Sequence, residues 1–205
     1  MYINTFLLLL LLPTLLFAGA EEKTAFIQGL KECEYYTTDQ GNILRYTCFK
    51  TPVKTNVQDL VFIQGRGTFL EFYEVLIVPL LERGFNVWTY DLTGQGGSSR
   101  LLNSKHHDPL SIQYLQHIDS FDTYLEDMDS FLSNIVLKNC DGKIILGGYS
   151  TGGHLVLRYA MNYKNSHLKS IFTISPLINL KTPIPNCFLS SIFWTASWII
   201  DLKRY

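Results

Sequence analysis

Short apolar runs alternate with segments of helical spacing from residue 60 to residue 174. Continuous apolar runs of this kind suit strands that are buried on both faces of a sheet. Residues 60–63 form such a run, and further strands are expected at residues 86–90, 143–146 and 168–174. Segments with helical periodicity separate them, at residues 69–83, 117–137 and 151–163. The alternation predicts an α/β fold in which a mostly parallel sheet carries helices on both faces.

The longest helical segment, residues 117–137, has one apolar face. Its apolar residues recur at three- and four-residue steps, at Ile118, Phe121, Leu125, Met128, Leu132 and Ile135. Acidic side chains fall mostly on its other faces, at Asp119, Asp122, Glu126, Asp127 and Asp129. We expect them to form a solvated face, with favourable charge near the helix N-terminus, in preference to a metal site. The segment 69–83 carries Pro79, which predicts a kink or a late restart, and it ends at Gly84.

Two further strands are expected at residues 32–38 and 42–49, before the alternating region begins. Gln40-Gly41 between them indicates a two-residue hairpin turn. Counting outward from that turn puts Cys33 opposite Cys48, so we hypothesise a cross-strand disulfide. The alternative is two free thiols in a half-buried hairpin.

The first twenty residues differ from the rest of the chain. Residues 6–17 are almost purely apolar, and Ala18-Gly19-Ala20 follows them. A short apolar core that ends in a small-residue cleavage site is typical of a secretory signal peptide. We therefore expect cleavage after Ala20 and export, to a periplasmic or secreted location. The alternative is an uncleaved membrane anchor, although the run is short for a membrane span.

Composition and charge limit the classes of function. The chain has 205 residues and a formal net charge of −1; 47% of its residues are hydrophobic and 17% are charged. These values fit one globular domain, and no basic run suggests a nucleic-acid surface. The four cysteines have no zinc-ligand spacing, so we expect neither a metal nor another cofactor. The composition predicts no particular oligomeric state.

Gly148-Tyr149-Ser150-Thr151-Gly152 matches the G-x-S-x-G pattern between an expected strand and an expected helix. In a nucleophile elbow, the serine lies on a sharp strand-to-helix turn, so the residues two before and two after it must be small. Here those residues are Gly148 and Gly152. The N-terminus of the following helix directs N–H groups and a positive dipole toward developing negative charge. We predict Ser150 as a catalytic nucleophile; the alternative is an ordinary serine in a glycine-rich turn.

A serine nucleophile needs a base to accept its proton and donors to hold an oxyanion. The backbone N–H that follows the nucleophile, that of Thr151, is one expected donor. The other should come from the loop after an earlier buried strand, which here is Gln64-Gly65-Arg66-Gly67. We expect this second donor to be the backbone N–H of Arg66. The alternative is a tight turn that needs glycine only for its dihedral angles.

Taken together, these segments resemble the α/β-hydrolase superfamily, in particular its monoacylglycerol lipase and bacterial lysophospholipase group, with a serine-aminopeptidase-type hydrolase domain. Residues 39–46 are similar to the opening hairpin of that group. Residues 84–99 are similar to a strand and the D-x-R-G-x-G-x-S loop that follows it, here the glycine-rich loop of residues 91–99. Residues 64–67 lie where the family often has His-Gly-x-Gly. The resemblance implies a carboxylic ester hydrolase that acts on lysophospholipid or monoacylglycerol-like substrates through an acyl-enzyme at Ser150.

Two residues depart from the family pattern. In residues 64–67, the oxyanion loop, Gln64 replaces the usual histidine. This replacement changes a side chain and leaves the backbone donor in place. Thr93 replaces the usual arginine of the glycine-rich loop. That loop is structural in the family, so we expect Asp91 to form a turn and not to serve as the catalytic acid.

The acid and the histidine of a triad do not appear in the superfamily's order, which is Ser, then Asp or Glu, then His. After Ser150 the one acidic residue is Asp201, and no histidine follows it. We expect His154 to point along the flank of its helix, and His167 to lie away from the catalytic end of the sheet. A makeshift base is conceivable in a loop near the catalytic face, at His106 and His107.

The last segment, residues 181–205, begins with prolines and then becomes strongly apolar. It is similar to the opening of the family's cap, and we expect the chain to stop before the last strands of the sheet. Residues 188–200 predict an amphipathic helix that contacts a membrane peripherally, or a packing helix without its partners. The expected division is therefore a signal peptide (1–20), the N-terminal part of a hydrolase domain (21–180) and the start of a cap (181–205).

Two functional interpretations remain open. The first is an exported serine esterase whose substrate is a lysophospholipid, a monoacylglycerol or, within the same broad superfamily, another ester or a peptide. The second is a catalytically inactive remnant or lipid-binding fragment, which the missing acid and histidine favour. A lipid or a small ester is the expected partner of the first.

Overall fold

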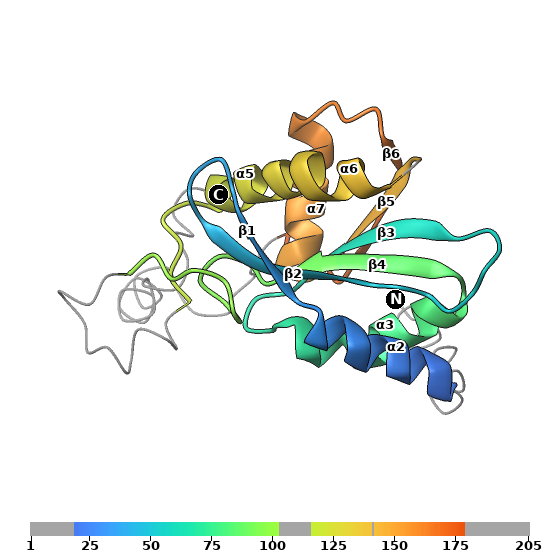
Figure 1. The fold of residues 1–205 in the computed structure, drawn as a ribbon. Helices are drawn as coiled ribbons and strands as arrows, with labels where there is room; N and C mark the ends of the chain where they lie inside the picture. Colours follow the sequence, from blue (N-terminus) through green and yellow to red (C-terminus); the bar gives the residue numbers. More distant parts are fainter. Residues whose placement is uncertain (1–18, 103–115, 141, 179–205) are drawn as a thin grey trace, which may run out of the picture.

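The computed structural model describes residues 19–102, 116–140 and 142–178, and its centre is a six-stranded sheet (Figure 1). The strand order is β1-β2-β4-β3-β5-β6. The strands are β1 (Glu34–Thr37), β2 (Ile43–Phe49), β3 (Gln58–Ile63), β4 (Phe85–Tyr90), β5 (Ile144–Tyr149) and β6 (Leu168–Ile174). β3, β4, β5 and β6 run parallel to one another. β2 is antiparallel to both of its neighbours, β1 and β4. The predicted α/β class and mostly parallel sheet are confirmed.

Helices cover both faces of this sheet (Figure 1). Along β3, Val61 and Ile63 point to one face and Leu60 and Phe62 to the other, and all four are buried, as the apolar run predicts. The first face carries α5 (Phe121–Phe131), the π-helical turn η2 (Leu132–Val136), α6 (Leu137–Asn139) and α7 (Thr151–Asn162). The opposite face carries α2 (Ala20–Lys31), the 3-10 turn η1 (Leu70–Tyr73) and α3 (Glu74–Glu82).

The helix boundaries follow local capping more closely than apolar periodicity. The Ser120 side chain accepts a hydrogen bond from the backbone N–H of Asp122 at 3.1 Å, so α5 begins at Phe121 and not at residue 117. The segment predicted as one helix around Pro79 is divided into η1 and α3, with Pro79 inside α3. It ends before Gly84, whose φ of 81° is readily adopted only by glycine.

Helix α2 was not predicted. Its buried residues are Phe26 and Gly29, too few for a clear apolar stripe. The signal present in the sequence is electrostatic, with Glu21 and Glu22 in the first turn and Lys31 in the last, where each charge suits the helix dipole. The Phe26 ring stacks on Phe49 of β2 with 4.8 Å between ring centroids, which fixes α2 against the sheet.

The predicted register of the hairpin is wrong by one residue. Thr38 and Asn42 pair through a 2.8 Å hydrogen bond, and the Gly41 N–H donates to the Thr38 carbonyl at 2.9 Å, so three residues form the loop. With Thr37 opposite Ile43, Cys33 lies opposite Thr47 and not Cys48. A shift of one residue turns Cys48 to the other face of the sheet. The hypothesis of a Cys33–Cys48 disulfide is therefore wrong, and both thiols are free.

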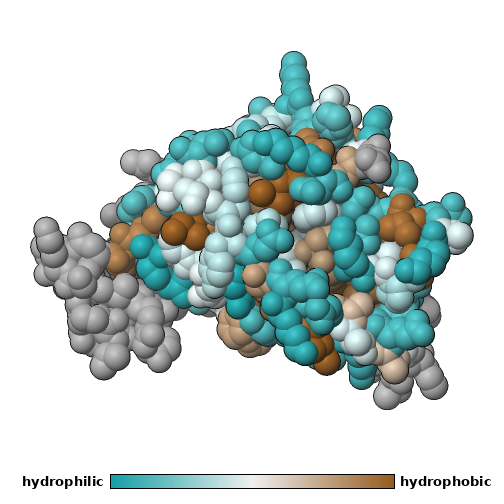
Figure 2. Space-filling view, viewed as in Figure 1, coloured by the Kyte–Doolittle hydropathy of each residue, from teal (hydrophilic) through white to brown (hydrophobic). Residues whose placement is uncertain are grey.

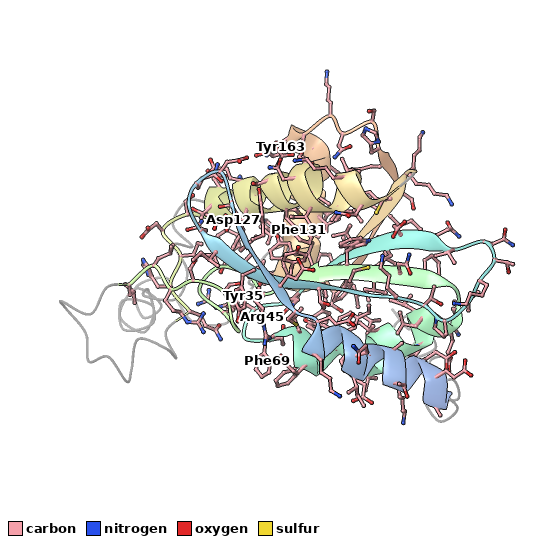
Figure 3. The ribbon with its side chains drawn as sticks, in the orientation of Figure 1. Tyr35, Arg45, Phe69, Asp127, Phe131 and Tyr163 are labelled. Carbon is pink, nitrogen blue, oxygen red and sulfur yellow. The ribbon has the colours of Figure 1, made fainter. Side chains whose placement is uncertain are left out.

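Asp127 does not belong to a solvated acidic face. It is 0% exposed, and its carboxylate accepts hydrogen bonds from Thr93 Oγ1 at 2.6 Å and from Asn42 Nδ2 at 3.0 Å. These contacts join α5 to the glycine-rich loop and to the hairpin, and Figure 3 shows Asp127 on the side of α5 that faces them. Burial raises the pKa of Asp127, although the hydrogen bonds act in the opposite direction.

Several predictions concern residues outside those that the structure describes: the apolar segment 6–17, His106, His107, and the segment 181–205. Among the described helices, none is both long and apolar enough to cross a membrane. The visible surface is mostly hydrophilic, with hydrophobic side chains in small separate patches (Figure 2).

Candidate active site

Ser150 lies at the junction of β5 and α7, at the carboxyl end of the parallel strands. Its φ of 53° and ψ of −114° form a conformation that residues other than glycine rarely adopt, at a cost of about 1–3 kcal/mol. Neighbouring backbone groups hold it there. The Ser150 N–H donates to the Ile174 carbonyl at 2.9 Å, and the Ser150 carbonyl accepts from the N–H groups of His154 and Leu177 at 3.1 and 3.0 Å. The backbone is thus fixed on both sides of the nucleophile candidate.

The glycines beside Ser150 permit an unusually close approach of α7 to the sheet. A Cβ atom at Gly152 would collide with the backbone carbonyl oxygens of Ile63 and Gln64, at the end of β3. A Cβ atom at Gly148 would collide with the carbonyl oxygen of Gly152. The first turn of α7 therefore rests directly on the segment that leads into the loop 64–67.

The loop 64–67 lies against Ser150. A Cβ atom at Gly65 would be 2.9 Å from Cδ1 of Tyr149 and 3.5 Å from Cβ of Ser150. The Gly65 N–H donates to the Tyr73 hydroxyl at 2.8 Å, and the Gly67 N–H donates to Oε1 of Gln95 at 2.5 Å. Among the described residues, the structure records no acceptor for the N–H of Arg66, which lies between them, or for that of Thr151. The role of these two N–H groups as oxyanion donors stays a prediction.

Gln64 turns away from this site. Its side chain is 0% exposed and donates from Nε2 to the Tyr90 carbonyl at 2.8 Å and to Oδ1 of Asp91 at 3.3 Å. The residue that departs from the family's histidine thus ties the loop 64–67 to the end of β4, and the backbone of the loop keeps its place.

Asp91 is an acceptor within the glycine-rich loop. Its buried carboxylate accepts from Nε of Arg45 at 2.7 Å, from the Leu70 N–H at 2.9 Å and from the Gly97 N–H at 2.7 Å. Arg45 also forms a two-point contact with Glu71, at 2.9 and 2.8 Å. Figure 3 shows Arg45 reaching from the hairpin toward the segment of Phe69. These contacts accord with a turn-forming Asp91 and leave it no role as a catalytic acid.

The described histidines do not reach Ser150 Oγ. The ring of His154 packs edge-to-face with Phe121, with centroids 5.7 Å apart, and burial together with Arg158 lowers its pKa. His117 Nε2 lies 2.8 Å from Oδ1 of Asp119. His167 precedes β6, whereas Ser150 contacts the far end of that strand at Ile174. In the described parts of the chain, no side chain forms a hydrogen bond with Ser150 Oγ.

A hollow of about 430 Å³ opens beside the oxyanion loop. Gly67, Thr68 and Phe69 line it on one side, and the glycine-rich loop lines the other. Phe69 is the one large apolar side chain among its described lining residues. The Phe69 ring meets the ring of Phe72 edge-to-face, with centroids 4.8 Å apart, and the two residues remain 37% and 62% exposed. The charge of Arg45, which also lines the hollow, is balanced by its two carboxylate partners. The side chains that line the hollow are therefore mostly polar or charged, with Phe69 beside them.

The sequence did not indicate Tyr73 or Gln95 as part of this site. Tyr73 lies in η1 without a recognisable motif. Gln95 lies inside the glycine-rich loop, where the glycines alone carry the pattern. One signal for Gln95 was available: its loop directly follows β4, and the loops after parallel strands meet at the same edge of the sheet.

Comparisons with known proteins place this geometry in a family. The family model described as "Serine aminopeptidase, S33" matches residues 55–204. Phospholipase YtpA of Bacillus subtilis is 25% identical over 125 residues, which are 61% of this chain and 42% of that protein. A probable lysophospholipase L2 of Haemophilus influenzae is 25% identical over 152 residues, which are 73% of this chain and 45% of that protein. The chain thus spans less than half the length of these curated relatives.

Solved structures share the fold. The α/β-hydrolase GrgF from Penicillium sp. sh18 has a TM-score of 0.56 and 19% identity, over 81% of this chain and 52% of that one. A probable hydrolytic enzyme from Pseudomonas aeruginosa has a TM-score of 0.54 and 19% identity, over 71% of this chain and 41% of that one. With most of its length matched by the family model and this fold around Ser150, the chain belongs to the serine aminopeptidase S33 family of α/β-hydrolases.

Proposed function

We propose that this chain is a serine hydrolase that cleaves carboxylic esters of the lysophospholipid or monoacylglycerol type through an acyl-enzyme at Ser150. The observation that carries the proposal is that Ser150, held at a φ of 53°, lies against the loop of Arg66 and directly before Thr151, whose N–H groups have no recorded acceptor among the described residues. The names of the two curated relatives, a phospholipase and a probable lysophospholipase, support a lipid ester. Phe69, which lines the hollow beside Gly67, and the adjoining exposed ring of Phe72 offer apolar contact to an acyl chain.

In the proposed reaction, Ser150 Oγ attacks the ester carbonyl carbon and its proton passes to a base. The carbonyl oxygen becomes an oxyanion that accepts from the N–H groups of Arg66 and Thr151. The tetrahedral intermediate then collapses, and the glycerol-bearing alcohol leaves with the proton. Water hydrolyses the acyl-serine by the same steps and releases the fatty acid. We assign the base to a group outside the described residues.

A panel of substrates tests the proposal. Purified protein is assayed with palmitoyl lysophosphatidylcholine, monopalmitoylglycerol, p-nitrophenyl acetate and leucine p-nitroanilide, with Ser150→Ala as the matched control. Release of palmitate that Ser150→Ala abolishes is expected. A preference for the acetate ester over both lipids would reject the lipid assignment, and a preference for the anilide would indicate a peptidase.

One observation favours a second candidate, a lipid-binding protein without catalysis: no described side chain contacts Ser150 Oγ as a base would. That candidate predicts that the protein binds lysophospholipid without releasing palmitate, and that Ser150→Ala leaves the binding unchanged. Tryptophan fluorescence measures the binding.

Export belongs to the proposal too. N-terminal sequencing of the exported chain should begin at Glu21, and a chain that retains Met1 would favour the uncleaved anchor.

A further inference from the structure

We propose that Tyr73 and Gln95 are positioning residues that aim the Arg66 N–H at the oxyanion, an inference that rests on the proposed hydrolase function. The two side chains occupy the N–H groups on either side of Arg66. Tyr73 accepts from the Gly65 N–H at 2.8 Å, and Gln95 accepts from the Gly67 N–H at 2.5 Å. The structure records no acceptor for the N–H of Arg66, between them, among the described residues.

The loop needs such a restraint because glycines flank Arg66. Glycine samples more of dihedral space than any other residue, so a Gly-Arg-Gly segment has no fixed conformation of its own. The Arg66 N–H belongs to the peptide unit between the two that these bonds anchor, and the carbonyl of that middle unit, that of Gly65, accepts from Thr68 Oγ1. Fixing the units on both sides restricts the dihedral angles that set its direction. Preorganised donors of this kind stabilise charge without reorganisation during the reaction.

Tyr73 holds its peptide unit through a closed set of hydrogen bonds. Thr68 Oγ1 donates to the Gly65 carbonyl at 2.8 Å, so its single hydroxyl proton is used. The Tyr73 hydroxyl must then donate to Thr68 Oγ1, 2.8 Å away, while it accepts from the Gly65 N–H. Its ring is 9% exposed and packs edge-to-face on Phe62, with centroids 5.1 Å apart. The packing of the ring against β3 therefore fixes the position of the Tyr73 hydroxyl.

Gln95 lies on the other side of Arg66, and its backbone is anchored. It is 2% exposed, and its own N–H donates to the Leu92 carbonyl at 2.8 Å within the glycine-rich loop. A peptide N–H can only donate, so the carboxamide oxygen of Gln95 must be the atom that faces Gly67. The glycine-rich loop is in turn fixed by the buried carboxylate of Asp91. Thus η1, through Tyr73, and the glycine-rich loop, through Gln95, set the conformation of the oxyanion loop.

Inactivation by an alkyl fluorophosphonate tests the inference on the full chain, because the limiting rate kinact and the binding constant KI report separate steps. Tyr73→Phe keeps the ring and removes the hydroxyl, and Gln95→Met keeps the length and removes the acceptor. Tyr46→Phe is the matched control, since Tyr46 is also 9% exposed and its hydroxyl donates to Glu34 Oε2 at 2.8 Å. We expect kinact to fall roughly 10- to 100-fold in the first two variants with KI unchanged. We expect neither constant to change in Tyr46→Phe.

Amide hydrogen exchange supplies a readout that needs no catalysis. In the wild type, the Gly65 and Gly67 amides should exchange slowly and the Arg66 amide fast; Tyr73→Phe should release Gly65, and Gln95→Met should release Gly67. Loss of this protection with kinact unchanged would overturn the inference, as would slow exchange at Arg66. A folded wild type that the probe does not label would refute the hydrolase proposal, and the exchange pattern alone would then decide whether the restraint exists.

Discussion

Gly152→Ala should disrupt the elbow by forcing α7 away from β3. The added Cβ atom would lie 2.6 Å from the carbonyl carbon of Ile63 and closer still to two carbonyl oxygens. Carbon atoms in contact prefer a separation of about 3.5 Å, so the first turn of α7 must retreat by about 1 Å. The atoms in the way belong to the backbone and cannot rotate aside. Overpacking of this kind costs about 1–3 kcal/mol of folding free energy.

The same displacement should impair chemistry more than stability, because it moves Ser150 and Thr151 relative to Arg66. A misplacement of 1 Å can lower a rate by about 100-fold. Urea unfolding followed by circular dichroism measures the first effect, and the rate of fluorophosphonate labelling measures the second. Gly142→Ala is the control, because a Cβ atom there would have no neighbour within 4 Å. A Gly152→Ala variant with wild-type unfolding free energy and labelling rate would refute the close-packing argument.

Three further predictions follow from other parts of the fold. Peptide mapping without reduction should find Cys33 and Cys48 as free thiols; a peptide that links them would contradict the hairpin register. Asp91→Asn should lower the free energy of unfolding in urea by about 3 kcal/mol, because an amide nitrogen replaces one of the two buried oxygens that accept from Arg45, Leu70 and Gly97; a loss below about 1 kcal/mol would contradict the buried contact. Burial raises the pKa of Asp127 above its unfolded value, so the folded state binds the proton more tightly and the wild type should gain stability relative to Asp127→Asn as the pH falls toward about 4, the ordinary pKa of an aspartate. A difference between these two proteins that does not vary with pH would count against that buried carboxylate.

β3 was predictable because it is buried on both faces, and it coincides with an apolar run in the sequence to within two residues. β6 has the predicted bounds, although it lies at the edge of the sheet and none of its residues is buried. The hairpin register was not predictable, since Gln40-Gly41 fits both a two-residue turn and the last part of a three-residue loop. The choice depends on the hydrogen bond from Gly41 to Thr38, and composition does not specify it.

Burial of polar groups depends on contacts between distant segments. Asp127 shares its helix with solvated acids, and only its meeting with Thr93 and Asn42 makes it a core residue. Within the site, the G-x-S-x-G pattern was sufficient to locate Ser150, because the strained turn has local steric requirements. Tyr73 and Gln95 have no such local requirement, and their contacts with the loop 64–67 exist only once η1 and the glycine-rich loop are folded beside β3.

The proposed hydrolase function depends most on Ser150 as a nucleophile. Intact-mass measurement after exposure to a fluorophosphonate tests this role directly. Wild type and Ser150→Ala are treated in parallel, with circular dichroism to show that both are folded. The account predicts one added phosphonyl group on the wild type, located at Ser150 by peptide mapping, and none on Ser150→Ala. A folded wild type that gains no mass, or equal labelling of both proteins, would contradict it.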